Sequence, residues 1–454
     1  MELNVAMNID TTKYLVIGAG ITGLSVVKYL SSCEKDFRIM DTRTIPPNAK
    51  HIKELLPSSQ IKFGSLDSQW LADADVIVLS PGVSPQDPSI LNYVNNNVEI
   101  IGDVELFAQE ANKPYITVTG SNGKSTVTTL VTDILVSQGI NAKAGANIGE
   151  PALSLLDDPL VDMYVLELSS FQLETCSSIT PECAVVLNVS DDHLDRHKNL
   201  QEYAAIKSSI YINAKNKIAP RNEDANIQAG SDVVSFGLSE PAVDHYGVRE
   251  YEGEQWLVRG EERLLNTKEL RLIGDTGILN ALAALALTEN YIKDKEKALA
   301  TIKAFSGLPH RCQVVLEHEE VKWIDDSKGT NIGATVSAVT SIDSSMILIL
   351  GGVHKGGSLS ALINAVQKNV SHVITFGQDK KIFTDAMQGV VDVTELNTLS
   401  EVVKHACKIV NKGDVVLLSP ACASLDMFEN YIERGLEYQS HVKKYVMGIE
   451  DERK

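Results

Sequence analysis

The sequence lacks several features that would point to an exported or membrane protein. No apolar run reaches the roughly 20 residues that a membrane-spanning helix needs. The first ten residues contain two acids and no basic stretch followed by an apolar core, so we expect no signal peptide. The six cysteines are scattered and include no Cys-x-x-Cys pair, which argues against a disulfide framework. These absences predict a cytoplasmic protein with reduced cysteines and no membrane partner.

Positive charge is also scarce. The chain has 41 Lys and Arg against 60 Asp and Glu, a net charge of −19, and neutralising nucleic-acid phosphates would require a basic surface. Nucleic acid is therefore excluded as an expected partner, and each cation inside a motif becomes more informative. With 454 residues the chain is too long for one ordinary domain, and its length suggests about three. We expect a monomer.

The most informative motif is a candidate phosphate loop. Residues 119–126 read Thr-Gly-Ser-Asn-Gly-Lys-Ser-Thr, after an apolar β-branched stretch and before a run with helical periodicity. In such a loop, backbone N–H groups and the helix N-terminus bind phosphates, the lysine reaches the outer phosphates and the next hydroxyl can hold Mg²⁺. A strict Walker A motif would have glycine at position 118, where this chain has Val118. The strand–loop–helix context nevertheless predicts nucleoside triphosphate binding.

The hydrophobic pattern predicts three α/β units in a row, at residues 1–102, 103–306 and 307–454. The first has a Rossmann-like pattern, with a strand at 14–17, Gly-x-Gly-x-x-Gly at 18–23, and strands at 37–40 and 76–79. The second contains the phosphate loop, strands at 164–168 and 184–189, an antiparallel hairpin within 250–265, and an Ala/Leu-rich helix at 278–291. The third is again Rossmann-like, and a parallel sheet is expected there. The predicted fold is thus α/β with three domains.

Glu167, His193 and Lys207, which follow the phosphate loop in the sequence, are candidates for a metal site. Glu167 ends a predicted strand, where a carboxylate can hold the Mg²⁺ of a nucleotide, although a helix-capping or surface carboxylate fits equally well. His193 lies in an acid-rich segment for which a solvated polar loop is the simpler interpretation. Lys207 lies on the apolar face of the next predicted helix, and either extends outward to water or is functional. A buried, neutral lysine could add CO₂ and become a carbamate that binds metal ions.

The third unit carries further polar groups at predicted strand ends. Asp325 to Asn331, Lys355 and Ser419 to Phe428 each follow a predicted strand, and small residues with hydroxyl or cationic groups at such positions form a plausible anion site. Each signal is weak alone, but three on one sheet suggest a small acidic substrate.

Taken together, the motifs resemble the Mur ligase family of ATP-dependent amino-acid ligases in peptidoglycan synthesis. The resemblance covers essentially the whole chain, and is greatest to members that add D-glutamate to UDP-N-acetylmuramoyl-L-alanine. It rests on seven segments in order: Gly-Ser-Asn-Gly-Lys-Ser-Thr (120–126), Asn147-Ile-Gly-Glu-Pro, Glu167-Leu-Ser-Ser-Phe-Gln-Leu, Asp192-His-Leu-Asp-Arg, Leu308-Pro-His-Arg, Asp326-Ser-Lys-Gly-Thr-Asn and Ser419-Pro-Ala-Cys-Ala-Ser-Leu-Asp.

This resemblance implies a UDP-substrate-binding first domain, a central P-loop ATPase-like domain and a C-terminal domain that binds the amino acid, with ATP and Mg²⁺ as cofactors. The uridine diphosphate part would contact Ile21, Thr22, Asp41, Thr42, Arg43 and Gly82, and the muramoyl-peptide would contact Asn147. ATP would be bound by Gly120, Ser121, Asn122, Gly123, Lys124, Ser125, Thr126, Asn280, Arg311 and Asp326. Mg²⁺ would be held by Ser125, Glu167, His193 and a carbamylated Lys207, which with Lys124 form the catalytic set. D-glutamate would be surrounded by Thr330, Lys355, Ser424 and Tyr431.

One position departs from the family pattern, and two other protein classes share single motifs with the chain. Family members often have His-Asn-x-x-Asn before the Ala-rich helix, whereas this chain has Thr276-Gly277-Ile-Leu-Asn280. An NAD-dependent oxidoreductase would explain Gly-x-Gly-x-x-Gly and Asp41, but leaves the phosphate loop unexplained. A GTPase would explain Asn411-Lys-Gly-Asp414, which fits a helix end before a strand better. A folate-polyglutamating ligase is a related alternative, distinguishable by the acceptor that stimulates ATP turnover.

Overall fold

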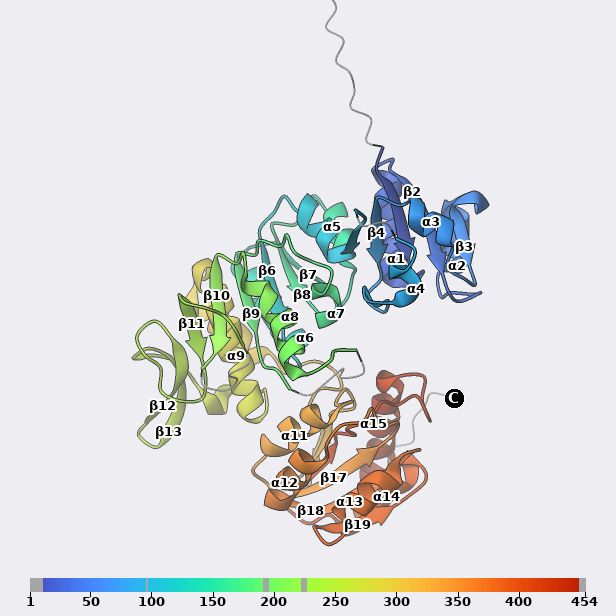
Figure 1. Cartoon of the computed structure of the whole chain (residues 1–454). Helices are drawn as coiled ribbons and strands as arrows, with labels where there is room; N and C mark the ends of the chain where they lie inside the picture. The colour runs from blue at the N-terminus through green and yellow to red at the C-terminus, as the bar shows by residue number, and fades with distance from the viewer. Residues whose placement is uncertain (1–10, 95–96, 191–195, 222–226, 449–454) are drawn as a thin grey trace, which may run out of the picture.

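The computed structural model describes residues 11–94, 97–190, 196–221 and 227–448. Three β-sheets, each flanked by helices, follow one another along the chain (Figure 1). The first is blue in Figure 1, the second green to yellow, and the third orange to red. Within the described ranges, no helix has both the length and the apolar character that crossing a membrane requires.

The N-terminal sheet has five parallel strands in the order β3-β2-β1-β4-β5. The strand order reverses between β1 and β4, and ligands of such sheets bind beyond the carboxyl ends of the strands at this switch point. The elements are β1 (Lys13–Ile17), α1 (Ile21–Ser32), β2 (Asp36–Asp41), α2 (Ala49–Leu55), β3 (Ile61–Phe63), α3 (Ser68–Asp73), β4 (Val76–Leu79), α4 (Pro88–Leu91) and β5 (Glu99–Gly102).

The central sheet has nine strands in the order β14-β13-β12-β11-β10-β9-β6-β8-β7. Strand β6, which leads into the phosphate loop, lies between β9 and β8, and β12 to β14 add an antiparallel extension. The elements are α5 (Asp103–Glu110), β6 (Tyr115–Thr119), α6 (Lys124–Ser137), β7 (Ala142–Ala146), β8 (Met163–Glu167), α7 (Ser170–Leu173), β9 (Cys183–Val186), α8 (Leu200–Ser208), β10 (Asn216–Pro220), β11 (Val233–Phe236), β12 (Tyr246–Tyr251), β13 (Glu254–Arg259), β14 (Glu262–Asn266), α9 (Gly274–Thr288) and α10 (Lys295–Ala304).

The C-terminal sheet has the order β15-β16-β20-β17-β18-β19 and is parallel from β16 to β19. Strand β15 is antiparallel to β16, so the expectation of a parallel sheet is wrong at this edge. The elements are β15 (Gln313–His318), β16 (Val321–Asp325), α11 (Ile332–Thr340), β17 (Met346–Gly351), α12 (Ser360–Asn369), β18 (Val370–Phe376), α13 (Lys380–Met387), β19 (Asp392–Glu395), α14 (Leu399–Ile409), β20 (Val415–Leu418) and α15 (Tyr431–Met447).

Burial on both faces explains why these strands read as continuous apolar runs. Every residue of β6, β17 and β20 is buried, because helices cover both sides of the sheets. In the C-terminal sheet, one core lies against α11, α12 and α13, and the other lies against α14 and α15. Acidic residues end several of the parallel strands: Asp41 ends β2, Glu167 ends β8 and Asp325 ends β16.

Candidate active site

The N-terminal domain has a cavity of about 810 Å³ beyond the carboxyl ends of β1, β2 and β4. All the residues predicted to contact the UDP-linked substrate line it: Ile21, Thr22, Asp41, Thr42, Arg43, Gly82 and Asn147. Asn147 comes from the central domain, so the cavity continues from the first sheet toward the second. Arg196 also lines it, and this residue was not predicted as part of the site. Its guanidinium donates to Glu174 Oε2 over 2.6 Å and to the Val83 carbonyl over 3.1 Å, which joins the two domains.

Asp41, at the end of β2, organises this cavity. Its carboxylate accepts hydrogen bonds from the Ala19 N–H over 2.7 Å and from Arg43 Nε and Nη2 over 2.9 and 2.6 Å. Burial alone would raise the pKa of Asp41, but the Arg43 hydrogen bond and the two backbone donors lower the pKa to about 2. The glycine motif is required sterically, because a Cβ at Gly23 would lie 1.8 Å from the Gly18 carbonyl oxygen. Asp41 and Arg43 therefore form a fixed, charged wall.

The phosphate loop joins the end of β6 to the start of α6. Gly123 caps the helix at φ 84°, a left-handed conformation that favours glycine. Lys124 Nζ donates to the carbonyls of Gly120 over 2.8 Å and Ser121 over 3.0 Å. The Asn188 amide pairs with both the N–H and the carbonyl of Asn122, which fixes the tip of the loop. Sequence reasoning missed Asn188, whose only signal was its position at the end of a predicted strand.

Glu167 is the last residue of β8, next to β6, and only 2% of its surface is exposed. Oε1 accepts a hydrogen bond from Asn147 Nδ2 over 2.7 Å, while Oε2 has no partner among the described residues. The surface interpretation is therefore wrong, and a buried carboxylate oxygen without a donor is suited to a cation. The same carboxylate links the UDP-side residue Asn147 to the sheet that carries the phosphate loop.

Lys207 lies behind the phosphate loop rather than at the surface. Only 1% of its surface is exposed, so the alternative that the side chain extends into water is wrong. Its Nζ donates to the Gly120 carbonyl over 3.0 Å and lies 4.5 Å from the centre of the Tyr203 ring. His193 falls outside the described residues. Within the described part of the chain, no three His, Cys, Asp or Glu side chains form a metal-binding cluster.

The C-terminal domain reaches the phosphate loop through Arg311, whose Nη2 donates to Ser125 Oγ over 2.7 Å. Between the domains lies a cavity of about 110 Å³. Six of the predicted ATP-binding residues line it: Asn122, Gly123, Thr126, Asn280, Arg311 and Asp326. Burial raises the pKa of Asp326 to about 7, opposed by hydrogen bonds from Ser419 Oγ and the Cys312 N–H. A nucleotide here would contact both domains at once.

The departure at positions 276 and 277 has a steric basis. A Cβ at Gly277 would lie 2.7 Å from Leu272 Cβ, so a larger side chain does not fit without a shift of the backbone. Thr276 Oγ1 lies 2.8 Å from Ser337 Oγ of α11, which adds a second hydrogen bond between the domains. In this chain, the start of α9 therefore packs against the C-terminal domain through small residues.

The residues predicted to bind the amino acid lie in the C-terminal domain. Lys355 Nζ is 3.5 Å from Thr330 Oγ1, and the Tyr431 ring centre is 4.0 Å from Lys328 Nζ. Ser424 is buried after β20, where its carbonyl accepts from the Phe428 N–H over 3.0 Å. Burial and the nearby Arg311 lower the pKa of Lys328 to about 8. Lys328 was not predicted as a site residue, although a cation between Asp326 and Thr330 could have signalled it.

Comparison with known proteins agrees with this arrangement. Three family models match in order: "Mur ligase MurD-like, N-terminal domain" at residues 12–102, "Mur ligase middle domain" at 118–288 and "Mur ligase, glutamate ligase domain" at 310–422. The chain belongs to the Mur ligase family. The UDP-N-acetylmuramoylalanine–D-glutamate ligase of Escherichia coli K12 is 42% identical over 436 residues, covering 95% of this chain and 98% of that protein. The Pseudomonas aeruginosa enzyme of the same name is 40% identical over 437 residues, covering 95% and 97%.

Solved Mur ligases share the fold at lower identity. The UDP-N-acetylmuramate-alanine ligase of Thermotoga maritima matches with a TM-score of 0.58 at 18% identity, covering 96% of this chain and 100% of that one. The MurF ligase of the same organism, solved with ADP, matches with a TM-score of 0.56 at 17% identity, covering 96% and 98%. The predicted three-domain α/β fold is thus confirmed. The Asn411–Asp414 segment is a turn between α14 and β20, in a different domain from the phosphate loop, which leaves a GTPase without structural support.

Proposed function

We propose that this Mur ligase joins D-glutamate to UDP-N-acetylmuramoyl-L-alanine, with conversion of ATP to ADP and phosphate. The observation that carries the proposal is the 40–42% identity to D-glutamate ligases over 95% of the chain. The site geometry supports it, because a cavity large enough for a UDP-linked substrate leads through Asn147 and Glu167 to the phosphate loop. An amino acid bound at Lys355 and Thr330 would approach from the third domain.

The first chemical step activates a carboxylate, which is a poor electrophile. An oxygen of the substrate carboxylate attacks the γ-phosphorus of ATP, the bond to the β-phosphate oxygen breaks, and an acyl phosphate and ADP result. Phosphoryl transfer of this kind depends mainly on positioning and charge neutralisation. Lys124 would leave the carbonyls of Gly120 and Ser121 to meet the outer phosphates, and Arg311 would reach them from the other domain.

The second step forms the amide. The amine of D-glutamate attacks the acyl carbon, a tetrahedral intermediate forms, phosphate leaves, and the nitrogen loses its extra proton. Lys355 and Thr330 would hold the carboxylates of the amino acid, so that its amine is directed at the acyl carbon. Lys328 lies between the ATP-side and amino-acid-side residues, and adds positive charge where phosphate departs.

The residues present fit a magnesium ion. Glu167 Oε2 is a buried oxygen without a partner in the described structure, and Ser125 provides a hydroxyl directly after the phosphate-loop lysine. A bound Mg²⁺ would neutralise phosphate charge. We also propose that Lys207 acts as its carbamate, since burial disfavours a charged ammonium and favours the amine that adds CO₂, and the carbamate would supply carboxylate-like oxygens for the metal.

The test is phosphate release measured against a panel of UDP-muramoyl acceptors and amino acids. We expect turnover only with UDP-N-acetylmuramoyl-L-alanine and D-glutamate, and none with L-glutamate or meso-diaminopimelate. A folate acceptor serves as the control for the related polyglutamating ligases. Comparable rates with L-glutamate, or stimulation by the folate alone, would show that the substrate assignment is wrong.

We further propose that the enzyme works as a cytoplasmic monomer. All six cysteines are unpaired, as is usual in a reducing compartment, and Arg311 of the third domain reaches Ser125 of the phosphate loop within the same chain. Sedimentation equilibrium at the concentrations used for assays tests the monomer directly, and a dimer at those concentrations would contradict it.

A further inference from the structure

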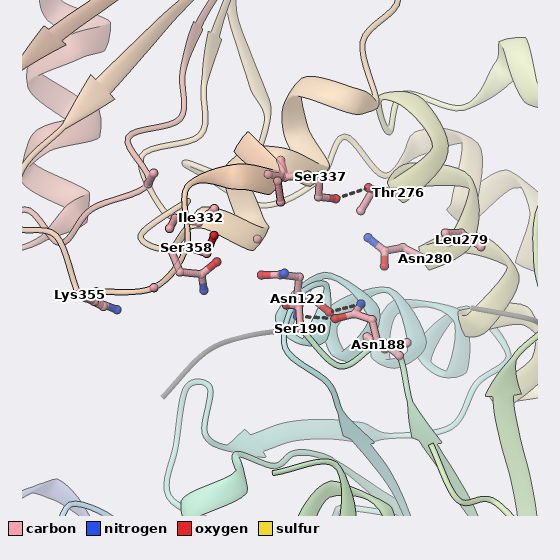
Figure 2. A pocket seen from close by; sticks show the side chains of 18 of the residues that line it. Asn122, Asn188, Ser190, Thr276, Leu279, Asn280, Ile332, Ser337, Lys355 and Ser358 are labelled. Atoms are coloured by element: carbon pink, nitrogen blue, oxygen red, sulfur yellow. Dashed lines mark hydrogen bonds between the residues drawn. The ribbon is translucent and has the colours of Figure 1, made fainter. Parts of the chain in front are cut away.

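The four residues proposed to surround the amino acid come from four separate segments of the C-terminal domain. Thr330 follows β16, Lys355 follows β17, Ser424 follows β20, and Tyr431 is the first residue of α15. Figure 2 shows Lys355 at the left of a cavity of about 820 Å³ between the central and C-terminal domains, with Asn280, proposed to bind ATP, on its right. The spacing of the four segments therefore decides how the amino acid is presented to the rest of the site.

One buried arginine contacts the chain before three of these segments. Arg434 lies in the first turn of α15 and is fully buried. Its Nε donates to Ser327 Oγ over 2.9 Å, and its Nη2 donates to the Ser327 carbonyl over 2.7 Å. Nη1 and Nη2 each donate to the Cys422 carbonyl over 3.1 Å, and Nη1 also donates to the Gly351 carbonyl over 3.4 Å. The guanidinium thus joins the ends of β16, β17 and β20.

The fourth segment joins the same network through Ser327. The Ser327 hydroxyl accepts from Arg434 and donates to the Tyr431 carbonyl over 2.8 Å. Each residue that accepts from Arg434 lies a few positions before one of the proposed amino-acid ligands: Ser327 before Thr330, Gly351 before Lys355, and Cys422 before Ser424. One side chain is therefore connected to all four segments.

The loops that carry Lys355 and Ser424 are also joined directly to each other. The Val353 N–H donates to the Ala423 carbonyl over 2.8 Å, and the Ala423 N–H donates to the Val353 carbonyl over 3.0 Å. A Cβ at Gly352 would lie 2.2 Å from the Ala423 carbonyl oxygen, so this close approach requires glycine. These two loops therefore form one unit, whose position relative to the loop after β16 is set by Arg434.

The chemistry of Arg434 suits this task. A guanidinium has five N–H donors in one plane, and the five hydrogen bonds of Arg434 go to a hydroxyl and to main-chain carbonyls. Burial lowers the pKa of Arg434 to about 10, so the side chain keeps its charge at neutral pH. Lysine would keep the charge but could not hold carbonyls of separate segments in a fixed plane. The arrangement thus depends on the shape of the guanidinium.

We propose that Arg434 is a positioning residue that sets the spacing of the loops that bind the amino acid. The inference rests on the proposed function, because that function assigns Thr330, Lys355 and Ser424 to the amino acid. Since Arg434 is fully buried, it acts through these loops and not by touching the substrate. Fixed spacing lets separate hydroxyl and ammonium groups meet two carboxylates at once, which a loosely held set would do less well.

The experiment compares the KM values of the three substrates in Arg434→Lys and the wild type. Steady-state rates of the full chain are measured at a temperature where thermal unfolding shows both proteins to be folded. We expect the KM for D-glutamate to rise roughly tenfold or more, as for the weakening of one charge-assisted hydrogen bond. The KM values for ATP and the UDP-linked acceptor should stay near those of the wild type. The kcat at saturating D-glutamate should fall much less than the KM rises.

A milder variant and a matched control accompany it. Ser327→Ala removes the hydroxyl between Arg434 and the Tyr431 carbonyl but leaves the main-chain bonds, so the KM for D-glutamate should rise in the same direction by a smaller factor. Tyr438→Phe is the control. Tyr438 lies on the same helix, is fully buried and donates to the Val416 carbonyl within β20 over 3.2 Å, away from the strand-end loops. This change should lower the unfolding midpoint and leave the KM for D-glutamate unchanged.

Three results would overturn the proposal. An unchanged KM for D-glutamate in Arg434→Lys would show that the spacing does not depend on the guanidinium. A parallel rise of all three KM values would show a general disturbance of the enzyme. An equal rise in Tyr438→Phe would attribute the effect to lost stability.

Failure of the proposed function gives a different result. A wild-type enzyme that uses another amino acid in place of D-glutamate would contradict that function. The KM of Arg434→Lys for the amino acid that is used would then decide the role of Arg434 by the same comparison.

Discussion

The first and third domains are both built on sheets of mainly parallel strands, yet the pKa of an aspartate at a strand end is lowered in the first domain and raised in the third. In the first domain, Asp41 at the end of β2 is paired with Arg43, and its pKa is lowered to about 2. In the third, Asp326 directly follows β16, receives hydrogen bonds from Ser419 and the Cys312 N–H, and has its pKa raised to about 7 by burial. The difference lies in how far the effect of burial on the pKa is opposed: hydrogen bonds from a guanidinium and two backbone N–H groups outweigh it at Asp41, whereas Ser419, the Cys312 N–H and the charge of Arg311 do not outweigh it at Asp326.

The comparison shows how one architecture supports two kinds of site. The N-terminal cavity is open, charged and fixed, as suits recognition of a large, preformed substrate. The C-terminal domain buries its polar groups instead: Arg434 is fully buried and donates to Ser327 and to the carbonyl of Cys422. Electrostatic interactions are stronger where water is excluded, so the energy of a buried charged group changes strongly with pH, mutation and neighbouring ligands. The third domain is therefore the one whose stability and chemistry should change with conditions.

The largest expected effect is a loss of turnover on replacing Lys124, in the central domain between these two. Lys124→Ala should lower turnover by roughly 10³-fold, because it removes the cation aimed at the outer phosphates. Thermal unfolding should stay near that of the wild type, since the hydrogen bonds of the ammonium to the Gly120 and Ser121 carbonyls lie within its own loop. Turnover and unfolding are measured on the same preparation. Near-normal turnover would remove Lys124 from the mechanism.

Replacing a buried arginine in the third domain should reduce stability much more than replacing a partly exposed arginine in the first. Arg434→Ala should destabilise the third domain by about 3–5 kcal/mol, because it leaves a cavity and carbonyls without donors. Arg43→Ala, at a partly exposed guanidinium, should cost far less. Urea unfolding followed by the fluorescence of Trp323, with Trp70 and Trp256 replaced by Phe, reports on the third domain, and the fluorescence of Trp70, with Trp256 and Trp323 replaced by Phe, reports on the first.

Equal midpoints for Arg434→Ala and Arg43→Ala would mean that the buried network contributes nothing beyond an exposed ion pair. Arg434→Lys, which keeps the charge but not the planar set of donors, should recover only part of the loss.

The two aspartates should give pH dependences of different direction and range. Because the folded pKa of Asp326, about 7, lies above its usual value near 3.8, folding binds a proton, and stability falls as pH rises from about 4 to 7. The change is on the order of 4 kcal/mol. Asp326→Asn should abolish this fall between pH 5 and 8. Asp41 has a lowered folded pKa, so its contribution is present above pH 4 and is lost only as pH falls toward about 2.

Unfolding midpoints at pH 5 and pH 8 measure this contrast. Asp41→Asn should lower both midpoints by the same amount, whereas Asp326→Asn should bring them together. A wild-type protein equally stable at the two pH values would contradict the assignment for Asp326.

The smallest effect concerns the substrates that the two domains bind. Lys355→Ala should raise the KM for D-glutamate by about 10- to 100-fold, through loss of one charge-assisted hydrogen bond of roughly 1.5–3 kcal/mol. The KM for the UDP-linked substrate should not change. Arg43→Ala should do the reverse, and so provides the matched control. A parallel rise of both constants in either variant would show that the two domains do not divide the substrates as proposed.

The sequence allowed the fold class and the phosphate loop to be predicted because both depend on local patterns. A buried strand followed by Gly-x-x-Gly-Lys-Ser can be recognised without knowledge of distant contacts. Short strands such as β3, β5 and β19 were missed, since they are three or four residues long and only partly buried. Helix α9 begins four residues before the predicted start, at Gly274, where a tight turn against Ser341 replaces an ordinary cap.

In the candidate site too, features set by local sequence could be predicted, and features set by distant contacts could not. Lys207 was left as either surface-exposed or functional, because helical periodicity gives the face of a residue but not what covers that face. Only the packing of α8 behind the phosphate loop decides that it is buried. Asn188 and Lys328 were missed because their roles come from partners far along the chain, in the loop at Asn122 and at Tyr431.

The hydrogen bond from Arg311 to Ser125 joins two groups that are both assigned to the nucleotide. On the proposed assignment, ATP would replace this bond with contacts to phosphate, and the central domain alone would lack Arg311 and Asp326. A nucleotide held by the central domain alone would then lack the second cation that stabilises the transferring phosphoryl group. On this assignment, ATP would react only when the domain proposed to bind the amino acid is also in place, which would limit ATP hydrolysis without ligation.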